Sequence, residues 1–157
     1  MLDIHGSRSA AFHPAERTLV VGAAATVYVV DAERGEIVRT LANAHQGDAV
    51  YAVAFSSDGL VLASASDQGS LKLWDWPALS LRASVSMSKS LEPMAPVSLA
   101  LTRRGTRAAN GIVGRVHVVD ATKAREERTF ANTVEAPGAS STSSSEWLES
   151  PSRSYAA

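Results

Sequence analysis

The chain has 157 residues, of which 45% are hydrophobic and 20% are charged, and this is the usual length and composition of one soluble globular domain. A formal net charge of -1 gives no sustained excess of one sign, so we expect no binding to nucleic acid, and the longest apolar runs are too short to cross a membrane. The absence of cysteine excludes disulfides and thiolate metal sites, and with no signal-peptide pattern in residues 1–10 we expect an intracellular, cytoplasmic protein.

Three similar units follow one another along the chain. Each has two short apolar segments around a tight turn, a third segment that ends in Asp, and a weaker fourth segment. We expect antiparallel strands in the first unit at residues 10–14, 18–23, 26–31 and 36–41, in the second at 52–55, 62–66, 71–75 and 79–85, and in the third at 97–101, 107–111, 115–120 and 125–130.

Two landmarks recur together in these units. The first strand carries Phe12, Phe55 and Leu101, which are 43 and 46 residues apart. The third strand ends at Asp31, Asp75 and Asp120, which are 44 and 45 residues apart. A period in the mid-forties is typical of a four-stranded propeller blade. The sequence therefore predicts an all-β fold made of such blades.

Both faces of the first strand in the second unit are apolar. Simple alternation places Tyr51, Val53 and Phe55 on one face of the strand and Val50, Ala52 and Ala54 on the other. A strand that is apolar on both faces is expected between two neighbouring sheets, and the small alanines would allow these sheets to pack closely.

The second unit resembles the WD40-repeat family. The resemblance rests on Ala44-His45, the segment from Val53 to Gly59, the segment from Leu62 to Ser66, and the closing segment from Leu71 to Trp74-Asp75. It extends with weaker motifs over residues 10–130, and it implies WD40-type blades of four antiparallel strands in a β-propeller.

The resemblance also implies a buried hydrogen-bonded network that fixes each blade. Members of the family commonly build it from His, Ser or Thr, Asp and Trp, and by position these are His45, Ser64 and Trp74, with Gln68 at the fourth place and Asp67 displaced from it by one residue. In the first and third units Val30 and Val119 replace the Trp, so we expect apolar packing alone to hold those blades.

The chain is expected to divide into five segments. They are a leader or partial outer strand (1–9), a degenerate blade (10–43), the best-formed blade (44–86), a second degenerate blade (87–134) and a disordered Ser-rich tail (135–157). The resemblance implies a ring of typically seven blades, and three cannot close one. We therefore expect a fragment of a longer propeller, a truncated gene product, or a piece completed by further blades or by self-association.

The favoured function is a non-catalytic scaffold that binds other proteins through its loops. We expect no catalytic residue, cofactor or metal, because the four histidines lack ligand spacing and no nucleophile or phosphate-binding motif is present. The candidate contact residues are Gln46, Asp48, Asp67, Gln68, Arg103 and Arg104. The alternatives are opening blades similar to those of intraflagellar-transport-type propellers, a fragment of a propeller hydrolase or metal enzyme, and a nonfunctional truncated product.

Overall fold

The computed structural model describes residues 3–86, 96–112 and 115–131, and within them every regular element is a β-strand. Twelve strands form three antiparallel sheets of four. The first sheet contains β1 (Ser7–Phe12), β2 (Thr18–Ala23), β3 (Thr26–Asp31) and β4 (Glu36–Leu41). The middle sheet contains β5 (Val50–Phe55), β6 (Val61–Ser66), β7 (Ser70–Asp75) and β8 (Ser80–Ser86). The third contains β9 (Pro96–Leu101), β10 (Arg107–Ile112), β11 (Arg115–Asp120) and β12 (Arg125–Ala131).

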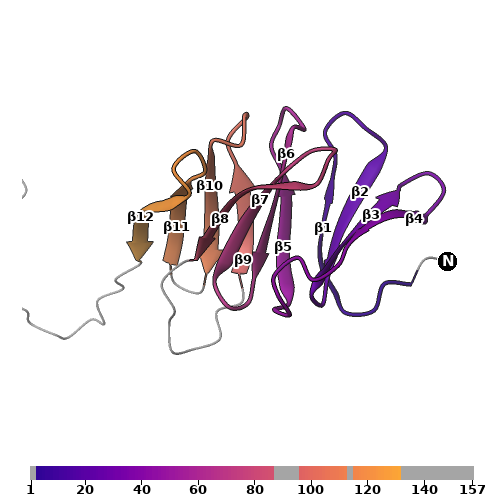
Figure 1. The fold of residues 1–157 in the computed structure, drawn as a ribbon, viewed down its shortest axis with the longest axis horizontal. Helices are drawn as coiled ribbons and strands as arrows, with labels where there is room; N and C mark the ends of the chain where they lie inside the picture. The colour runs from indigo at the N-terminus through magenta and orange to yellow at the C-terminus, as the bar shows by residue number, and fades with distance from the viewer. Residues whose placement is uncertain (1–2, 87–95, 113–114, 132–157) are drawn as a thin grey trace, which may run out of the picture.

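The three sheets stand side by side in the order of the chain (Figure 1). Each is a meander in which every strand pairs with the next one along the sequence. The predicted all-β fold of four-stranded blades is confirmed, and the described residues form an open row of sheets and no closed ring. The tail predicted at residues 135–157 lies outside the described residues.

The pairing irregularities recur at equivalent places in all three sheets. Each first strand has a register shift against the second strand, and each fourth strand has one against the third. A β-bulge adds twist and redirects the side chains that follow it. The units therefore repeat in backbone geometry as well as in sequence.

Apolar side chains fill the space between neighbouring sheets. Between the first and middle sheets the buried members include Val20, Val27, Val53 and Trp74. Between the middle and third sheets the alanines and leucines of β6 and β7 pack against residues that include Ala108 and Val119. All six residues of β6 are buried, because this strand has a sheet on each side. The expectation that the first strand of the second unit lies between two sheets is confirmed, because Val53 of β5 packs toward the first sheet and Ala52 toward the third.

Simple alternation is wrong at the start of β5. Val50 lies in the same buried cluster as Val53, facing the first sheet, whereas Ala52 belongs to the cluster facing the third sheet. The reason is the register shift between Val50 and Ala52, since a bulge changes the face on which every residue before it falls.

Turns at one end of the sheets join neighbouring units. We call this the Asp58 end, because Asp58 lies there between β5 and β6. The Asp58 backbone N–H donates to the carbonyl of Arg103 in the third unit at 3.1 Å. His13, in the turn after β1, lies with its Nε2 3.1 Å from the carbonyl of Gly59. The turn between β5 and β6 is thus held from both sides.

Candidate functional site

The opposite end of the sheets, which we call the His45 end, carries the loop 42–49 and the turn between β6 and β7. His45 lies in that loop and only 2% of its surface is exposed. Two backbone hydrogen bonds tie the loop and the first residue of β5 to the turn between β2 and β3, from Ala44 N to Ala25 O at 2.9 Å and from Val50 N to Ala24 O at 2.6 Å. The loop is therefore fixed against the first sheet as well as the middle one.

A chain of side-chain hydrogen bonds runs from this loop into the middle sheet. Trp74 Nε1 on β7 donates to Ser64 Oγ on β6 at 2.9 Å, and the same oxygen lies 2.8 Å from His45 Nε2. A hydroxyl can accept the indole N–H while it donates its own proton, so Ser64 can bridge the two rings. The structure thus brings together His45, Ser64 and Trp74.

The second nitrogen of His45 meets a residue that the sequence analysis did not single out. Its Nδ1 lies 3.1 Å from Ser70 Oγ at the start of β7, where the resemblance led us to expect Gln68 or Asp67. Within the described residues the buried Oδ1 of Asp67 has no hydrogen-bond partner, and Gln68 is exposed. Ser70 was missed because the turn from β6 to β7 has a geometry that residue counting does not give.

Burial keeps the His45 imidazole neutral. Desolvation, helped by the nearby positive charge of Lys72, lowers the pKa of His45 from 6.5 to about 4. A neutral ring donates from one nitrogen and accepts at the other, which suits a donor role toward Ser70 and an acceptor role toward Ser64.

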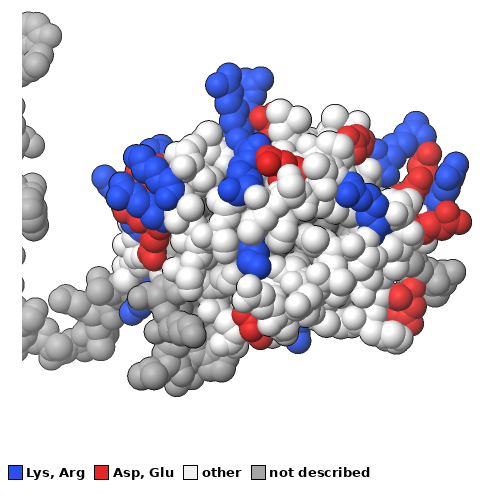
Figure 2. All heavy atoms as spheres, viewed as in Figure 1, with Lys and Arg blue, Asp and Glu red and all other residues white. Residues whose placement is uncertain are grey.

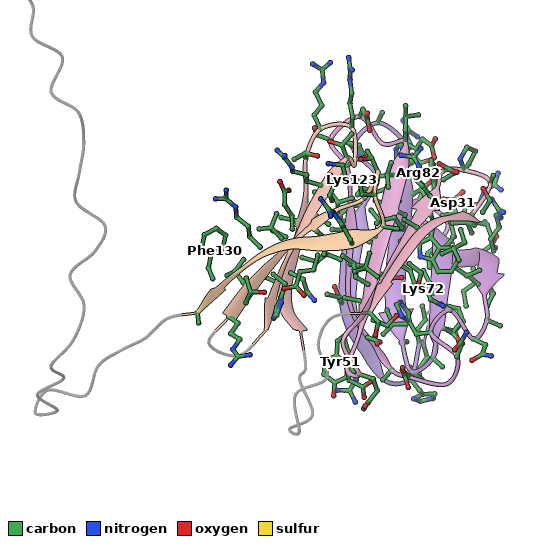
Figure 3. All side chains as sticks on the ribbon, turned by 60° about the vertical axis from the view of Figure 1, so that its left-hand side comes forward. Asp31, Tyr51, Lys72, Arg82, Lys123 and Phe130 are labelled. Atoms are coloured by element: carbon green, nitrogen blue, oxygen red, sulfur yellow. The ribbon has the colours of Figure 1, made fainter. Side chains whose placement is uncertain are left out.

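A depression of about 600 Å³ opens beside this chain on the His45 end. Its lining combines loop, turn and outer-strand residues, among them Gln46, Asp48, Gln68, Lys72 and Leu81. Lys72 Nζ donates to the carbonyl of Ala44 at 2.7 Å. This hydrogen bond orients the aliphatic part of the Lys72 side chain along the wall of the depression. Figure 3 shows Lys72 and Tyr51 toward this end of the sheets, with Asp31, Arg82 and Lys123 toward the other.

The candidate contact residues divide between the two ends. Gln46, Asp48 and Gln68 line the depression. Arg103 and Arg104 lie in the exposed turn between β9 and β10 at the Asp58 end. The structure therefore does not bring the arginines into the same surface as the other candidates. In Figure 2, Lys, Arg, Asp and Glu gather along the upper edge, which is the Asp58 end in this view.

A comparison with protein-family models found a match in the middle of the chain. The WD40 family (WD domain, G-beta repeat) matches residues 35–75, a stretch that holds β4 to β7 and includes His45, Ser64 and Trp74. Residues 35–75 are a WD40 repeat, and the three four-stranded antiparallel sheets support a WD40 propeller-type family. No curated protein matches it in a sequence comparison. WD40 domains generally serve as scaffolds that bind other proteins.

The third unit contains a polar cluster where apolar packing alone was expected. His117 on β11 is buried, and its Nδ1 lies 2.8 Å from Glu126 Oε1 and 3.1 Å from Thr129 Oγ1, both on β12. Hydrogen bonds from His117 and Thr129 lower the pKa of Glu126 against the opposing effect of burial. The expectation of apolar packing alone was wrong because it considered only the position at which Val119 replaces the Trp.

The first unit also contains a polar contact that the sequence did not reveal. The His13 ring accepts backbone N–H bonds from Ala15 and Glu16 at Nδ1, at 3.2 and 2.9 Å. It stacks on Trp76 of the middle unit, with 5.5 Å between ring centroids. The available signal was a histidine directly before Pro14 in a turn. Trp76 and Gly59 belong to another repeat, so spacing within one repeat could not identify these two partners of His13.

No group of three or more metal-binding side chains occurs in the part of the chain that the structure describes. In the same residues, no helix has the length and apolar character needed to cross a membrane.

Proposed function

We propose that the chain is a non-catalytic, cytoplasmic scaffold and that a partner protein binds it at the depression on the His45 end. The observation that carries the proposal is that this depression lies beside the side-chain hydrogen bonds that link His45, Ser64 and Trp74. The hydrogen bonds fix the loop 42–49 and β7 relative to each other, so the surface is organised before a partner arrives. Preorganisation lowers the entropy cost of binding.

The lining favours a polar peptide segment as the bound element. The depression presents an amide from Gln68, a carboxylate from Asp48, and hydroxyls from Ser70, Ser84 and Ser86. These groups can bind the backbone and polar side chains of an extended segment, and the exposed Leu81 offers one apolar contact. Recognition by a few placed polar groups on a rigid surface is usual for protein interfaces.

The test is quantitative affinity capture from cells with three forms of the full chain. The Gln68→Arg variant places a long cation in the depression, and we expect captured partners to fall at least tenfold relative to the original chain. The control is Arg34→Glu, an exposed change in the turn between β3 and β4 at the Asp58 end, and it should leave capture unchanged. Equal loss in both variants, or loss only in Arg34→Glu, would place the binding surface elsewhere.

A further inference from the structure

The third sheet has one face packed on the middle sheet and one face that no described residue covers. Leu99, Leu101, Ala108 and Val119 belong to the core shared with the middle sheet. The residues that alternate with them face away, and they include large apolar side chains. Val116 is 42% exposed and Phe130 is 55% exposed, and Figure 3 shows Phe130 on the outer strand, away from the other sheets.

This outer face repeats the face by which the first sheet packs on the middle one. In the first sheet Ser9 lies opposite Gly22 on the first two strands, and in the third sheet Ser98 lies opposite Gly111 in the same way. Ser98 is therefore equivalent to Ser9, and Gly111 to Gly22. The same registers relate the third and fourth strands of the two sheets. Residues of the third sheet then have equivalents in the first sheet: Val27 for Val116, Val29 for Val118, Leu41 for Phe130 and Arg39 for Arg128.

In the first sheet these residues make a close interface. The backbone N–H of Val53 donates to Ser9 Oγ at 3.1 Å. Gly22 lets Val50 approach so closely that a Cβ on this glycine would lie 2.7 Å from Val50 Cγ1. Arg39 donates across the interface to the carbonyls of Pro77 and Ala78. The face is thus shaped to receive the large apolar face of a following sheet.

The outside of the first sheet is a face of the other kind, equivalent to the face that the middle sheet presents to the first sheet. Phe12 occupies the position of Phe55 there and is 68% exposed, and Ala10 occupies the position of Val53. A hollow of about 540 Å³ lies on this side, lined by residues that include Ile4, Ala10 and Val21. The two uncovered faces are therefore of complementary kinds.

We propose that the outer face of the third sheet binds the outer face of the first sheet of a second copy of this chain, head to tail. Ser98 Oγ would accept from the Ala10 backbone N–H of the second copy, as Ser9 does from Val53. Arg128 would face the turn of the second copy that contains Glu33, since Glu33 holds the position of Pro77, and the opposite charges match. Two copies place six sheets in succession, within the four to eight that a propeller ring typically contains.

Cysteine pairing tests the contact directly, because the chain contains no cysteine of its own. The contact between Val53 N and Ser9 Oγ places these two residues side by side across the interface, and disulfides form between neighbouring residues whose Cα atoms lie about 4.4–6.8 Å apart. Under mild oxidation, Ala10→Cys chains mixed with Ser98→Cys chains of a different tag length should give a disulfide-linked mixed dimer. The control is Leu60→Cys, exposed by 58% in the turn between β5 and β6, mixed with Ser98→Cys. Equal linkage in the control, or linkage of Ala10→Cys to itself alone, would overturn the proposal.

Substitutions on the two faces give an independent test by sedimentation equilibrium of the full chain. Val116→Glu and Phe12→Glu should each raise the dissociation constant of the assembly at least tenfold, and Leu60→Glu should leave it unchanged. All three residues are exposed in the single chain, and circular dichroism should show each variant folded. A chain that is a monomer at every concentration would overturn the proposal. So would an assembly sensitive to Val116→Glu but not to Phe12→Glu, because that pattern indicates a symmetric contact.

Discussion

His45 connects the surface of the middle sheet to its interior. Its two ring nitrogens contact serines on different strands, Ser64 on β6 and Ser70 on β7. Through Ser64 it also reaches the indole of Trp74. A buried polar group left without its partner costs about 1–3 kcal/mol, so this arrangement strongly favours one position for the loop 42–49. The loop is therefore a rigid support for the depression at its side.

The neutral state of His45 makes stability depend on pH in a defined window. The pKa of His45 is lowered from 6.5 to about 4 on folding, so the unfolded chain binds the proton more readily than the folded one. Unfolding should therefore become easier as the pH falls from about 6.5 toward 4, by roughly 3 kcal/mol in total. Urea unfolding measured at steps between pH 7 and 4.5 checks this.

The control for this prediction is His45→Gln, which removes the titrating group and retains a side chain that can donate and accept hydrogen bonds. Its free energy of unfolding should change much less between pH 7 and 4.5. Carboxylates such as Asp120, whose pKa is lowered to about 2 mainly by its hydrogen bond from Thr122, lose most of their stabilising effect below about pH 4 and only a small part of it above that pH. A variant that keeps the full slope would show that another group causes it.

At the scale of elements, turns hold neighbouring sheets together through close contacts. Gly105, between β9 and β10, is buried with a positive φ of 61°. A Cβ at this position would lie 2.5 Å from Val61 Cγ2 and 2.6 Å from Val61 Cβ. Since Val61 is itself fully buried, it has little room to move. Any side chain larger than that of glycine at residue 105 therefore strains the packing of this turn on the middle sheet.

A matched pair of substitutions separates this packing effect from backbone strain. Gly35 also has a positive φ, of 65°, and a Cβ there would meet no atom within 4 Å. Gly35→Ala should cost about 1 kcal/mol from the left-handed backbone alone. Gly105→Ala should cost about 1–3 kcal/mol more because of overpacking. Thermal unfolding of both variants gives the comparison, and equal losses would mean that the contact with Val61 yields easily.

Strand positions were largely predictable because the period of the repeat fixes them, but some side-chain directions were not. The expected segments 18–23, 26–31 and 36–41 coincide with β2, β3 and β4. The face of Val50 was predicted wrongly because of the bulge between Val50 and Ala52. Bulges depend on how two strands pair, and one strand read alone carries no signal for them.

For the candidate site, the residues within one repeat were accessible from the sequence and those set by turn geometry were not. His45, Ser64 and Trp74 were singled out by resemblance, and they meet in the structure. Ser70 was not foreseen, and neither was the depression, because it combines a loop, a turn and the outer strand β8. Surfaces made from several segments depend on the tertiary arrangement.

At the scale of the whole molecule, the middle sheet is the centre of the structure. It shares one apolar core with the first sheet and another with the third, whereas each end sheet packs on one neighbour among the described residues. The hydrogen bonds that link His45, Ser64 and Trp74 add polar specificity to the packing of the middle sheet. We therefore expect this sheet to be the most stable of the three, and it holds the surface proposed for partner binding.

Amide hydrogen exchange, measured by mass spectrometry at a dilution where the chain is monomeric, tests this claim most directly. We predict that the amides of β6 and β7 exchange most slowly, because exchange there requires opening of both cores. The corresponding inner strands of the end sheets, β2 with β3 and β10 with β11, should exchange faster. Protection in either end sheet that equals or exceeds that of β6 and β7 would contradict the central role of the middle sheet.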